Sequence, residues 1–254
     1  MRTYFFVLLV LGLSACQAPS TTPPTTTAAA PNQLTQGEVA AGWKLLFDGT
    51  SLNGWHVWGH AGQPVTGWEV KDGELIALGV TEHGADLLTQ DPYESFELLV
   101  DWKVSPGGNS GILFHVVEDT ARYGAVYFTG PEYQLVDDIG FPEKLEDTQK
   151  SACNYGMHPV ASPPSKPAGE WNTSRLLVDG THVEHWLNGQ KTVEYEMWSP
   201  DWEARKAAGK WKDYPDYGLA RTGFISLQDH GLKTWFRNVK IRPIVRQGGD
   251  SDGD

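Results

Sequence analysis

The sequence is poor in cysteine and in basic residues, and each shortage excludes a class of protein. Two cysteines among 254 residues are too few for a cysteine-ligated metal cluster. The 20 Lys and Arg residues face 32 Asp and Glu, giving a net charge of −12, whereas nucleic-acid binding needs clustered basic residues. The sequence also contains no P-loop, Rossmann fingerprint, H-E-x-x-H or G-x-S-x-G motif. Neutral substrates and cations therefore remain as candidate ligands, and nucleic acid does not.

The sequence has no apolar run long enough to span a membrane. A shorter apolar run near the start is typical of an export signal. Arg2 precedes an apolar stretch at 4–13, which is too short to remain as a membrane-spanning helix. The small residues before Cys16 resemble a bacterial lipobox, in which that cysteine becomes the lipidated first residue; an ordinary cleaved signal peptide is the alternative. We expect lipidation at Cys16 and a lipoprotein of the periplasm or cell surface, anchored to the membrane by its lipid.

Composition divides the rest of the chain. Residues 17–40 begin with a stretch of mostly Thr, Pro and Ala, and this composition predicts a disordered tether. The acidic composition of 246–254 predicts a disordered tail. The stretch 41–245 predicts one folded domain. Cys153 has no partner within it, so we expect no disulfide and a small buried residue rather than a nucleophile.

Alternation of apolar and polar residues dominates this domain and predicts strands. Turn pairs that favour tight hairpins separate several of them, at Asp72-Gly73, Asp179-Gly180 and Asn188-Gly189. One helix interrupts the pattern, with Ser199 as N-cap, Pro200 as first residue and Gly209 at its end. About ten to fourteen short antiparallel strands predict an all-β jelly-roll sandwich of two antiparallel sheets with one short helix.

If one sheet face stays open, strand parity indicates which polar side chains line it. The expected set is Asp101, Lys103, His115, Glu132, Gln134 and Gln228, with Asn109 near a strand start and His230 at a strand end. Each has an ordinary structural explanation, as a solvated face, a turn or a core histidine. Convergence in one groove favours a binding site, and Trp171, one of eleven tryptophans, is a candidate platform for a sugar ring.

Five segments occur in order between residues 43 and 244: "WKLLFDGTSLNGWHVWG", "SFELLVDWKVSPGGNSGILFHV", "PEYQLVDD", "GEWNTSRLLVDGTHVEHWLNGQ" and "GFISLQDHGLKTWFRNVKIRPI". Together they resemble the bacterial 3-keto-disaccharide hydrolase domain family. The resemblance implies a concanavalin-like fold and action on glycosides already oxidised at C3 of the sugar. A sugar 3-oxidoreductase would then be the functional partner, and the substrate a small carbohydrate.

Such chemistry needs a base near C2, donors to the enolate oxygen and an acid near the leaving oxygen. Combined with position, the resemblance suggests Glu132 as the base and His230 as the acid or base partner. The expected substrate ligands are Lys103 and Gln228 at the keto oxygen and Asp101, Asn109 and Gln134 at hydroxyls. His115 stands where relatives have an arginine, which leaves its role open.

Two other functions remain open at this point. One is a conventional glycoside hydrolase, although the E-x-D-x-x-E strand motif of one jelly-roll class is absent. The other is a lectin-like carbohydrate-binding module, because fold does not decide function. No cofactor is required by the sequence, and the metal is unknown; a divalent cation such as Ca²⁺ is a candidate at the acidic stretch "LVDDIG".

Overall fold

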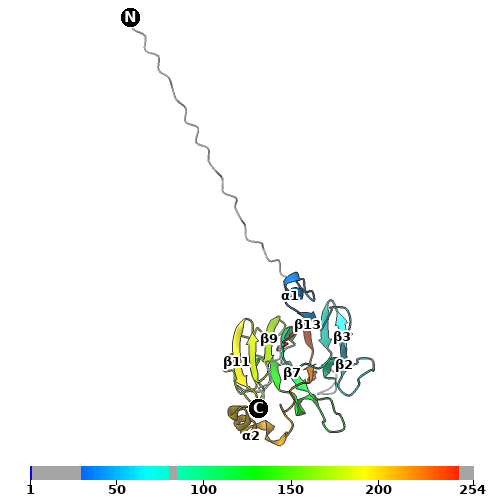
Figure 1. The fold of residues 1–254 in the computed structure, drawn as a ribbon, viewed down its shortest axis with the longest axis vertical. Coiled ribbons are helices and arrows are strands. Elements are labelled where there is room, and N and C mark those ends of the chain that lie inside the picture. Colours follow the sequence, from blue (N-terminus) through cyan, green and yellow to red (C-terminus); the bar gives the residue numbers. More distant parts are fainter. Residues whose placement is uncertain (2–29, 80–84, 246–254) are drawn as a thin grey trace, which may run out of the picture.

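The computed structural model describes residues 30–79 and 85–245, together with Met1, and shows two packed antiparallel sheets (Figure 1). The larger sheet contains β1 (Lys44–Leu45), β3 (Trp68–Lys71), β4 (Glu74–Ala77), β6 (Phe96–Val104), β9 (Asn172–Asp179), β10 (His182–Leu187), β11 (Gln190–Glu196) and β13 (Thr234–Pro243). The smaller contains β2 (Trp55–Val57), β5 (Leu87–Thr89), β7 (Asn109–Val116), β8 (Glu132–Val136) and β12 (Phe224–Leu227). The predicted all-β sandwich is confirmed.

The order of the strands mixes distant parts of the chain. The eight-stranded sheet runs β11-β10-β9-β6-β13-β4-β3, with β1 beside β13, and the five-stranded sheet runs β2-β5-β12-β7-β8. Within the described ranges no helix is long and apolar enough to cross a bilayer. Cys16 and the predicted tail at 246–254 lie outside the described residues.

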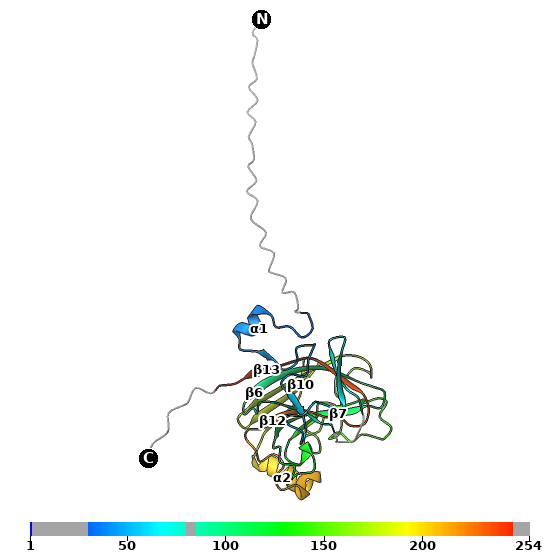
Figure 2. The same cartoon turned by 90° about the vertical axis from the view of Figure 1, so that its right-hand side faces the viewer.

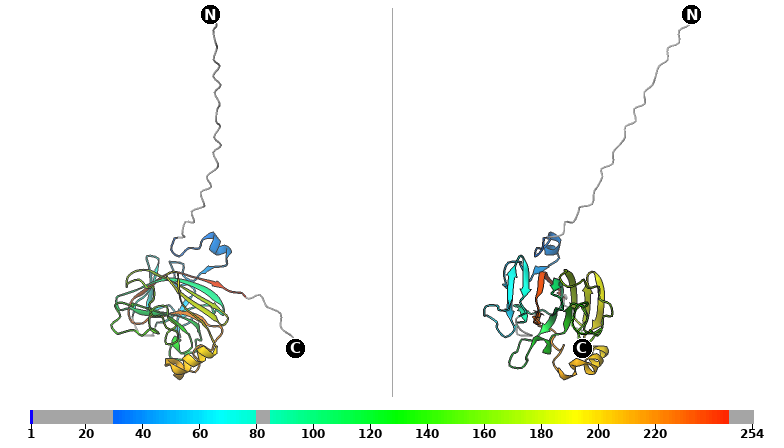
Figure 3. Two further views of the ribbon diagram at one scale, coloured as in Figure 1. Left: turned by 90° about the vertical axis from the view of Figure 1, so that its left-hand side faces the viewer. Right: turned by 180° about the vertical axis from the view of Figure 1, so that it is seen from behind.

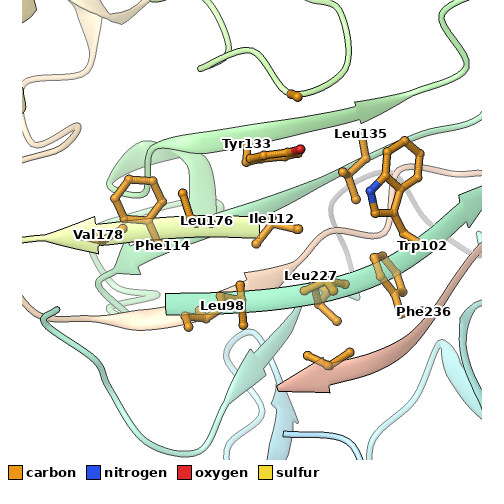
Figure 4. Packing of buried hydrophobic residues seen from close by; sticks show 14 of the residues in the cluster. Leu98, Trp102, Ile112, Phe114, Tyr133, Leu135, Leu176, Val178, Leu227 and Phe236 are labelled. Atoms are coloured by element: carbon orange, nitrogen blue, oxygen red, sulfur yellow. The ribbon is translucent and has the colours of Figure 1, made fainter. Parts of the chain in front are cut away.

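The core forms between the two sheets. Leu98 and Trp102 of β6 lie opposite Ile112 of β7 and Leu135 of β8, and all four are at most 1% exposed (Figure 4). The alternation in β6 sends its other residues to the outer face of the larger sheet, which is the pattern of a half-buried strand. Cys153 lies in the same core, free and fully buried, as predicted.

The hairpin residues adopt the backbone that their types favour. Asp72 and Gly73 have φ of 54° and 77° between β3 and β4, and Asn188 and Gly189 have φ of 48° and 81° between β10 and β11. Positive φ at both central residues is the type I′ arrangement, whose twist matches that of the flanking strands. These two predicted turns are confirmed, whereas in the third hairpin Asp179 pairs with His182, so that Gly180 and Thr181 form the turn instead of Asp179 and Gly180.

The predicted helix is α2 (Pro200–Ala208), and the Ser199 hydroxyl accepts from the Trp202 N–H at 3.2 Å. A short 3₁₀ turn, η2 (Lys210–Asp213), follows, and another, η1 (Val126–Phe128), precedes β8. The views in Figures 2 and 3 place α2 at the opposite end of the sandwich from the short helix α1 (Gln36–Ala40). The segment after β11 therefore covers one end of the sheets.

The structure differs from the expected disordered tether over 17–40 in its last part. Residues 36–40 form α1, which Thr35 and Glu38 close with a capping box. The Asn32 N–H donates to Asn238 Oδ1 at 2.6 Å, and the Asn238 N–H donates to Asn32 Oδ1 at 2.8 Å. These reciprocal hydrogen bonds satisfy the backbone of a segment with little apolar surface, which composition alone did not reveal.

Candidate active site

A polar pocket of about 140 Å³ lies on the outer face of the five-stranded sheet. Five predicted site residues line it: Asn109 of β7, Glu132 and Gln134 of β8, and Gln228 and His230 after β12. Tyr127, Tyr155, Lys210 and Tyr214 complete the lining. The structure thus brings together the larger part of the predicted set.

Strand pairing explains why the carboxyl and amide groups face outward. Tyr133 and Leu135 of β8 point into the core, so Glu132 and Gln134 point to the other face. In β7, Gly111 is the register partner of Gln134 and neighbours Glu132 diagonally. A Cβ on Gly111 would lie against Glu132 Oε1. The glycine therefore gives the carboxyl group the space that it occupies.

Glu132 is the carboxyl group of this pocket, and it is nearly inaccessible at 5% exposure. Burial raises its pKa to about 7, and the positive charge of Lys210 opposes that rise. A carboxyl group with a pKa near neutrality is suited to act as a general base. Its environment therefore favours proton transfer over a permanent ion pair.

Three amide oxygens supply acceptors around it. Asn109 Oδ1, Gln134 Oε1 and Gln228 Oε1 are buried and have no hydrogen-bond partner among the described residues. An unsatisfied buried polar atom is costly, and a hydroxyl-rich ligand would satisfy these three. Gln228 is held through its backbone, since its N–H donates to Gly111 O at 3.0 Å and its carbonyl accepts from Ser110 Oγ at 2.7 Å.

The turn after Gln228 is built on a second acidic residue, Asp86. The Asp229 N–H donates to Asp86 Oδ1 at 3.0 Å, and Asp229 Oδ1 accepts from the Gly231 N–H at 3.3 Å. Burial raises the pKa of Asp86 to about 7, and the charges of Asp229 and Glu132 add to the rise. This arrangement fixes the turn that carries the half-buried His230 to the edge of the pocket.

Asp101, Lys103 and Trp171 do not belong to the pocket, which corrects the prediction. Asp101 and Lys103 lie on the outer face of β6, in the other sheet. Asp101 accepts from Thr173 Oγ1 at 2.7 Å and from Asn238 Nδ2, whereas the Lys103 ammonium lies 3.1 Å from Glu74 Oε1. Trp171 stacks with that ammonium 4.5 Å from its ring centroid. The alternation of residues correctly predicted that Asp101 and Lys103 face outward, but β6 belongs to the eight-stranded sheet and not to the sheet that carries the pocket.

His115 is a second correction. Between β7 and β12 the register shifts, and His115 has a φ of 53° there, so a β-bulge breaks the alternation. The ring is 1% exposed, packs 5.2 Å from the Phe114 ring, and bonds Glu94 O through Nε2 at 2.7 Å. Burial lowers its pKa. His115 is therefore a buried residue that does not line the pocket.

Four lining residues come from connections between strands and were not predicted from the sequence. Tyr127 belongs to η1, Lys210 begins η2, Tyr214 follows η2, and Tyr155 lies in the loop after β8. Connections carry no strand period, so parity could not select them. The available signal was the density of aromatic and basic residues around 210–214.

Among the described residues, two groups outside the pocket are candidates for binding a cation. In the predicted stretch 135–140, Asp137 accepts from the N–H groups of Gly107, Ile139 and Gly140, so it serves its own loop. On β10 and β11, ligand atoms of His182, Glu184 and Glu194 lie within 4.8 Å of one another. Lys191 forms ion pairs with both of these glutamates.

A two-sheet sandwich whose outer face holds a pocket with one carboxyl group and three unsatisfied amide oxygens fits a protein that binds or cleaves a small hydroxyl-rich molecule such as a sugar. The chain belongs to the 3-keto-alpha-glucoside-1,2-lyase-like domain family, whose model matches residues 42–242. It is 33% identical over 232 residues to the 3-keto-disaccharide hydrolase of Bacteroides thetaiotaomicron, a match that covers 81% of this chain and 79% of that protein. The predicted family resemblance is confirmed.

Solved structures agree with this assignment. A Parabacteroides distasonis protein described as a glycosyl hydrolase is 42% identical with a TM-score of 0.80, over 85% of this chain and all of that one. A second from the same organism is 30% identical with a TM-score of 0.62, over 80% of this chain and 99% of that one. The predicted class, an enzyme of a glycoside-cleaving family, is confirmed at this level.

Proposed function

We propose that this enzyme cleaves glycosides oxidised at C3 of the sugar, beginning with removal of the C2 proton by Glu132. The buried carboxyl group of Glu132, with a pKa of about 7 at the pocket, carries this proposal. A ketone at C3 acidifies the hydrogen on C2, so a base of near-neutral pKa suffices to remove it. The relative that is a 3-keto-disaccharide hydrolase supports the same substrate class.

The reaction balances without a cofactor. Glu132 takes the C2 proton, the C–H electron pair forms C2=C3, and the carbonyl π pair moves to O3 as an enolate. The enolate then reforms C3=O, C1=C2 forms, and the bond between C1 and the leaving oxygen breaks as that oxygen takes a proton. Water finally adds its hydroxyl group to C1 and a proton returns to C2. The net change is hydrolysis of the glycosidic bond.

The remaining pocket residues fit defined roles in this scheme. His230, at the edge of the pocket, is the proposed proton donor to the leaving oxygen, because histidine exchanges protons near neutral pH. The unsatisfied amide oxygens of Asn109, Gln134 and Gln228 accept hydrogen bonds from sugar hydroxyl groups. The Gln228 amide also offers N–H donors toward the ring.

The pocket disfavours a conventional glycosidase mechanism. That mechanism uses two carboxyl groups on opposite sides of the scissile bond. Among the described residues that line the pocket, Glu132 is the one carboxyl group, and Asp86 is fully buried behind the turn. A single base beside neutral amides fits elimination from a 3-keto sugar better.

A matched pair of substrates tests the proposal. Purified enzyme is given a 3-keto-disaccharide or the same disaccharide unoxidised, without added cofactor, and the products are followed by mass spectrometry. We expect release of the second sugar from the oxidised substrate alone. This activity should be lost in Glu132→Gln and kept in Glu143→Gln, an exposed control. Turnover of the unoxidised sugar would identify a conventional glycosidase, and binding of the oxidised sugar without turnover would identify a lectin.

The proposed substrate also implies a partner and a location. A 3-keto sugar arises by oxidation of a secondary hydroxyl group, so a sugar 3-oxidoreductase must act before this enzyme. We further propose that a lipid on Cys16 anchors the enzyme to a membrane surface after export, as the signal-like start indicates. Mass spectrometry of the mature N-terminus tests the lipid, and an unmodified Cys16 in a membrane fraction would contradict it.

A further inference from the structure

Lys210 lines the pocket but was not predicted as a site residue. It is the first residue of η2, and its neighbour Trp211 anchors that turn in the core. The Trp211 ring stacks on Tyr217 at 4.0 Å and donates through Nε1 to Tyr155 O at 2.8 Å. The backbone at Lys210 is therefore held by a fully buried residue, and although Lys210 as a whole is exposed, its ammonium group packs against aromatic rings.

The side chain folds back so that its ammonium group lies at the mouth of the pocket. Lys210 Nζ is 4.5 Å from the ring centroids of Tyr155 and Trp211 and 5.5 Å from that of Tyr127. Rings at such distances attract a cation through their negative faces. They therefore hold the ammonium group of Lys210 beside the rings, at a position that lines the pocket.

The N–H donors of this ammonium group are not used within the fold. Across the ranges 30–79 and 85–245, no hydrogen bond or ion pair engages Lys210 Nζ. Lys206, one turn earlier in the chain, instead donates to Pro215 O and Tyr217 O at 2.9 and 2.8 Å. A cation held by rings but without an acceptor is prepared to bind an anionic or partly negative oxygen.

Lys210 and Glu132 influence each other across the pocket. Desolvation lowers the pKa of Lys210, and the charge of Glu132 opposes that change. Lys210 in turn holds the pKa of Glu132 below the value that burial alone would give. The two groups are therefore close enough to interact electrostatically before any substrate arrives.

The proposed reaction moves a negative charge within this same space. Before the first step the charge is on the Glu132 carboxylate, and after it the charge is on O3 of the enolate. Lys210 lines the same pocket as Glu132, so its ammonium group can bind the enolate oxygen, on which the negative charge develops during the transfer. Prearranged groups of this kind stabilise a transition state most, because they need little reorganisation as the charge develops.

We propose that Lys210 is a catalytic residue whose ammonium group binds the C3 oxygen of the 3-keto sugar and stabilises the enolate formed there. This inference rests on the proposed function and deepens it. Lys210 takes the role at the keto oxygen that was predicted for Lys103, which lies in the other sheet.

The test compares Lys210→Met with Lys212→Met, which removes the same charge from an exposed residue of the same turn. We expect Lys210→Met to lower kcat about 10²–10³-fold with a smaller change in KM, as for loss of one oxyanion donor. Lys212→Met keeps wild-type kinetics. Equal rates in Lys210→Met and wild type, with Glu132→Gln inactive, would overturn the role of Lys210 and leave the proposed function intact.

Two further measurements separate a chemical role from a structural one. Ethylammonium should restore part of the activity of Lys210→Ala in a saturable way and leave Glu132→Gln inactive. A 3-keto-1,5-anhydro sugar has no aglycone at C1, so exchange of its C2 proton in heavy water reports enolate formation without release of an aglycone. We expect Lys210→Met to slow this exchange, and unchanged exchange would contradict the proposal.

A covalent role for the same lysine makes a different prediction. If Lys210 formed an imine with the ketone, borohydride added during turnover would leave a stable sugar adduct on it. We expect no adduct on peptide mapping. An adduct at Lys210 would replace the ammonium role with imine catalysis. Absence of turnover in the wild-type enzyme, in contrast, would reject the proposed function itself.

Discussion

The Asp229 N–H donates to Asp86 Oδ1 at 3.0 Å, and both residues are fully buried. This bond ties the start of the turn that carries His230 to the residue just before β5. Two buried carboxyl groups beside Glu132 disfavour further negative charge, and Asp86 keeps its proton up to a pKa of about 7. The stability of the fold and the protonation of the site are therefore linked.

Asp86→Asn should stabilise the protein at alkaline pH. The unfolded chain releases this proton near the ordinary pKa of 3.8, whereas the folded protein keeps it to about 7. The folded state thus binds more protons in that window, and the contribution of Asp86 to stability falls as the pH rises through it. Relative to wild type, Asp86→Asn should gain about 2–3 kcal/mol between pH 5 and pH 8.

Urea unfolding at the two pH values measures this change, with the exposed Asp91→Asn as control. A constant difference between Asp86→Asn and wild type would show that Asp86 ionises normally in the folded state. Asp86 is not part of the pocket lining. The activity of Asp86→Asn therefore also shows whether the turn that carries His230 needs a carboxylate at position 86 as the acceptor.

The activity should follow the ionisation of Glu132. A base must be unprotonated to accept the C2 proton, and the pKa of Glu132 is raised to about 7. The kcat/KM of the wild-type enzyme should therefore fall about tenfold per pH unit below pH 7. Initial rates on a 3-keto-disaccharide between pH 5 and 8 check this limb. A flat profile over that range would exclude Glu132 as the base.

Gly111→Ala should damage the site from the opposite strand. Its Cβ would lie against Glu132 Oε1, so the carboxyl group must move or the strands must separate. Overpacking of this kind costs about 1–3 kcal/mol of stability, and we expect kcat to fall at least about tenfold with it.

Gly124→Ala is the matched control, since its Cβ would meet Phe128 at an ordinary 3.7 Å. Thermal unfolding and kinetics of both variants complete the comparison. Normal kinetics in Gly111→Ala would mean that the position of Glu132 in the structure is not the one used in the reaction.

His230→Ala should discriminate between leaving groups. A sugar alkoxide needs a proton as it departs, whereas a nitrophenolate does not. We therefore expect a loss of about 10²-fold or more on a 3-keto-disaccharide and a much smaller loss on the nitrophenyl 3-ketoglucoside. Equal losses on the two substrates would assign His230 to binding or positioning instead of proton donation.

The alternation of residues predicted strand faces correctly but could not assign strands to sheets. In β6, Asp101 and Lys103 are on the outer face as expected, yet β6 pairs with β9 and β13. Glu132 is also on an outer face, but β8 pairs with β7 in the other sheet. Pairing depends on contacts between distant segments, and these leave no local signal.

Local irregularities and connections account for the other differences. One bulge was enough to turn His115 from the open face into the core, because an added residue reverses parity beyond it. Lys210 and Tyr155 reach the pocket from connections whose course is set by buried anchors such as Trp211. By contrast, the outward direction of Glu132, Gln134 and Gln228 was predictable because each lies in or directly after a strand whose alternation continues to that residue.

The residues that line the pocket come from paired strands and from connections, and the two kinds of segment differ in how readily their residues can be substituted. The base and the amides belong to paired strands, where each substitution disturbs register or core packing. Lys210 and Tyr214 belong to the connection that leads from β11 in one sheet to β12 in the other. A change in that connection would therefore alter the aromatic rim and remove or keep the Lys210 ammonium, while the base and the amides stay in place on their paired strands.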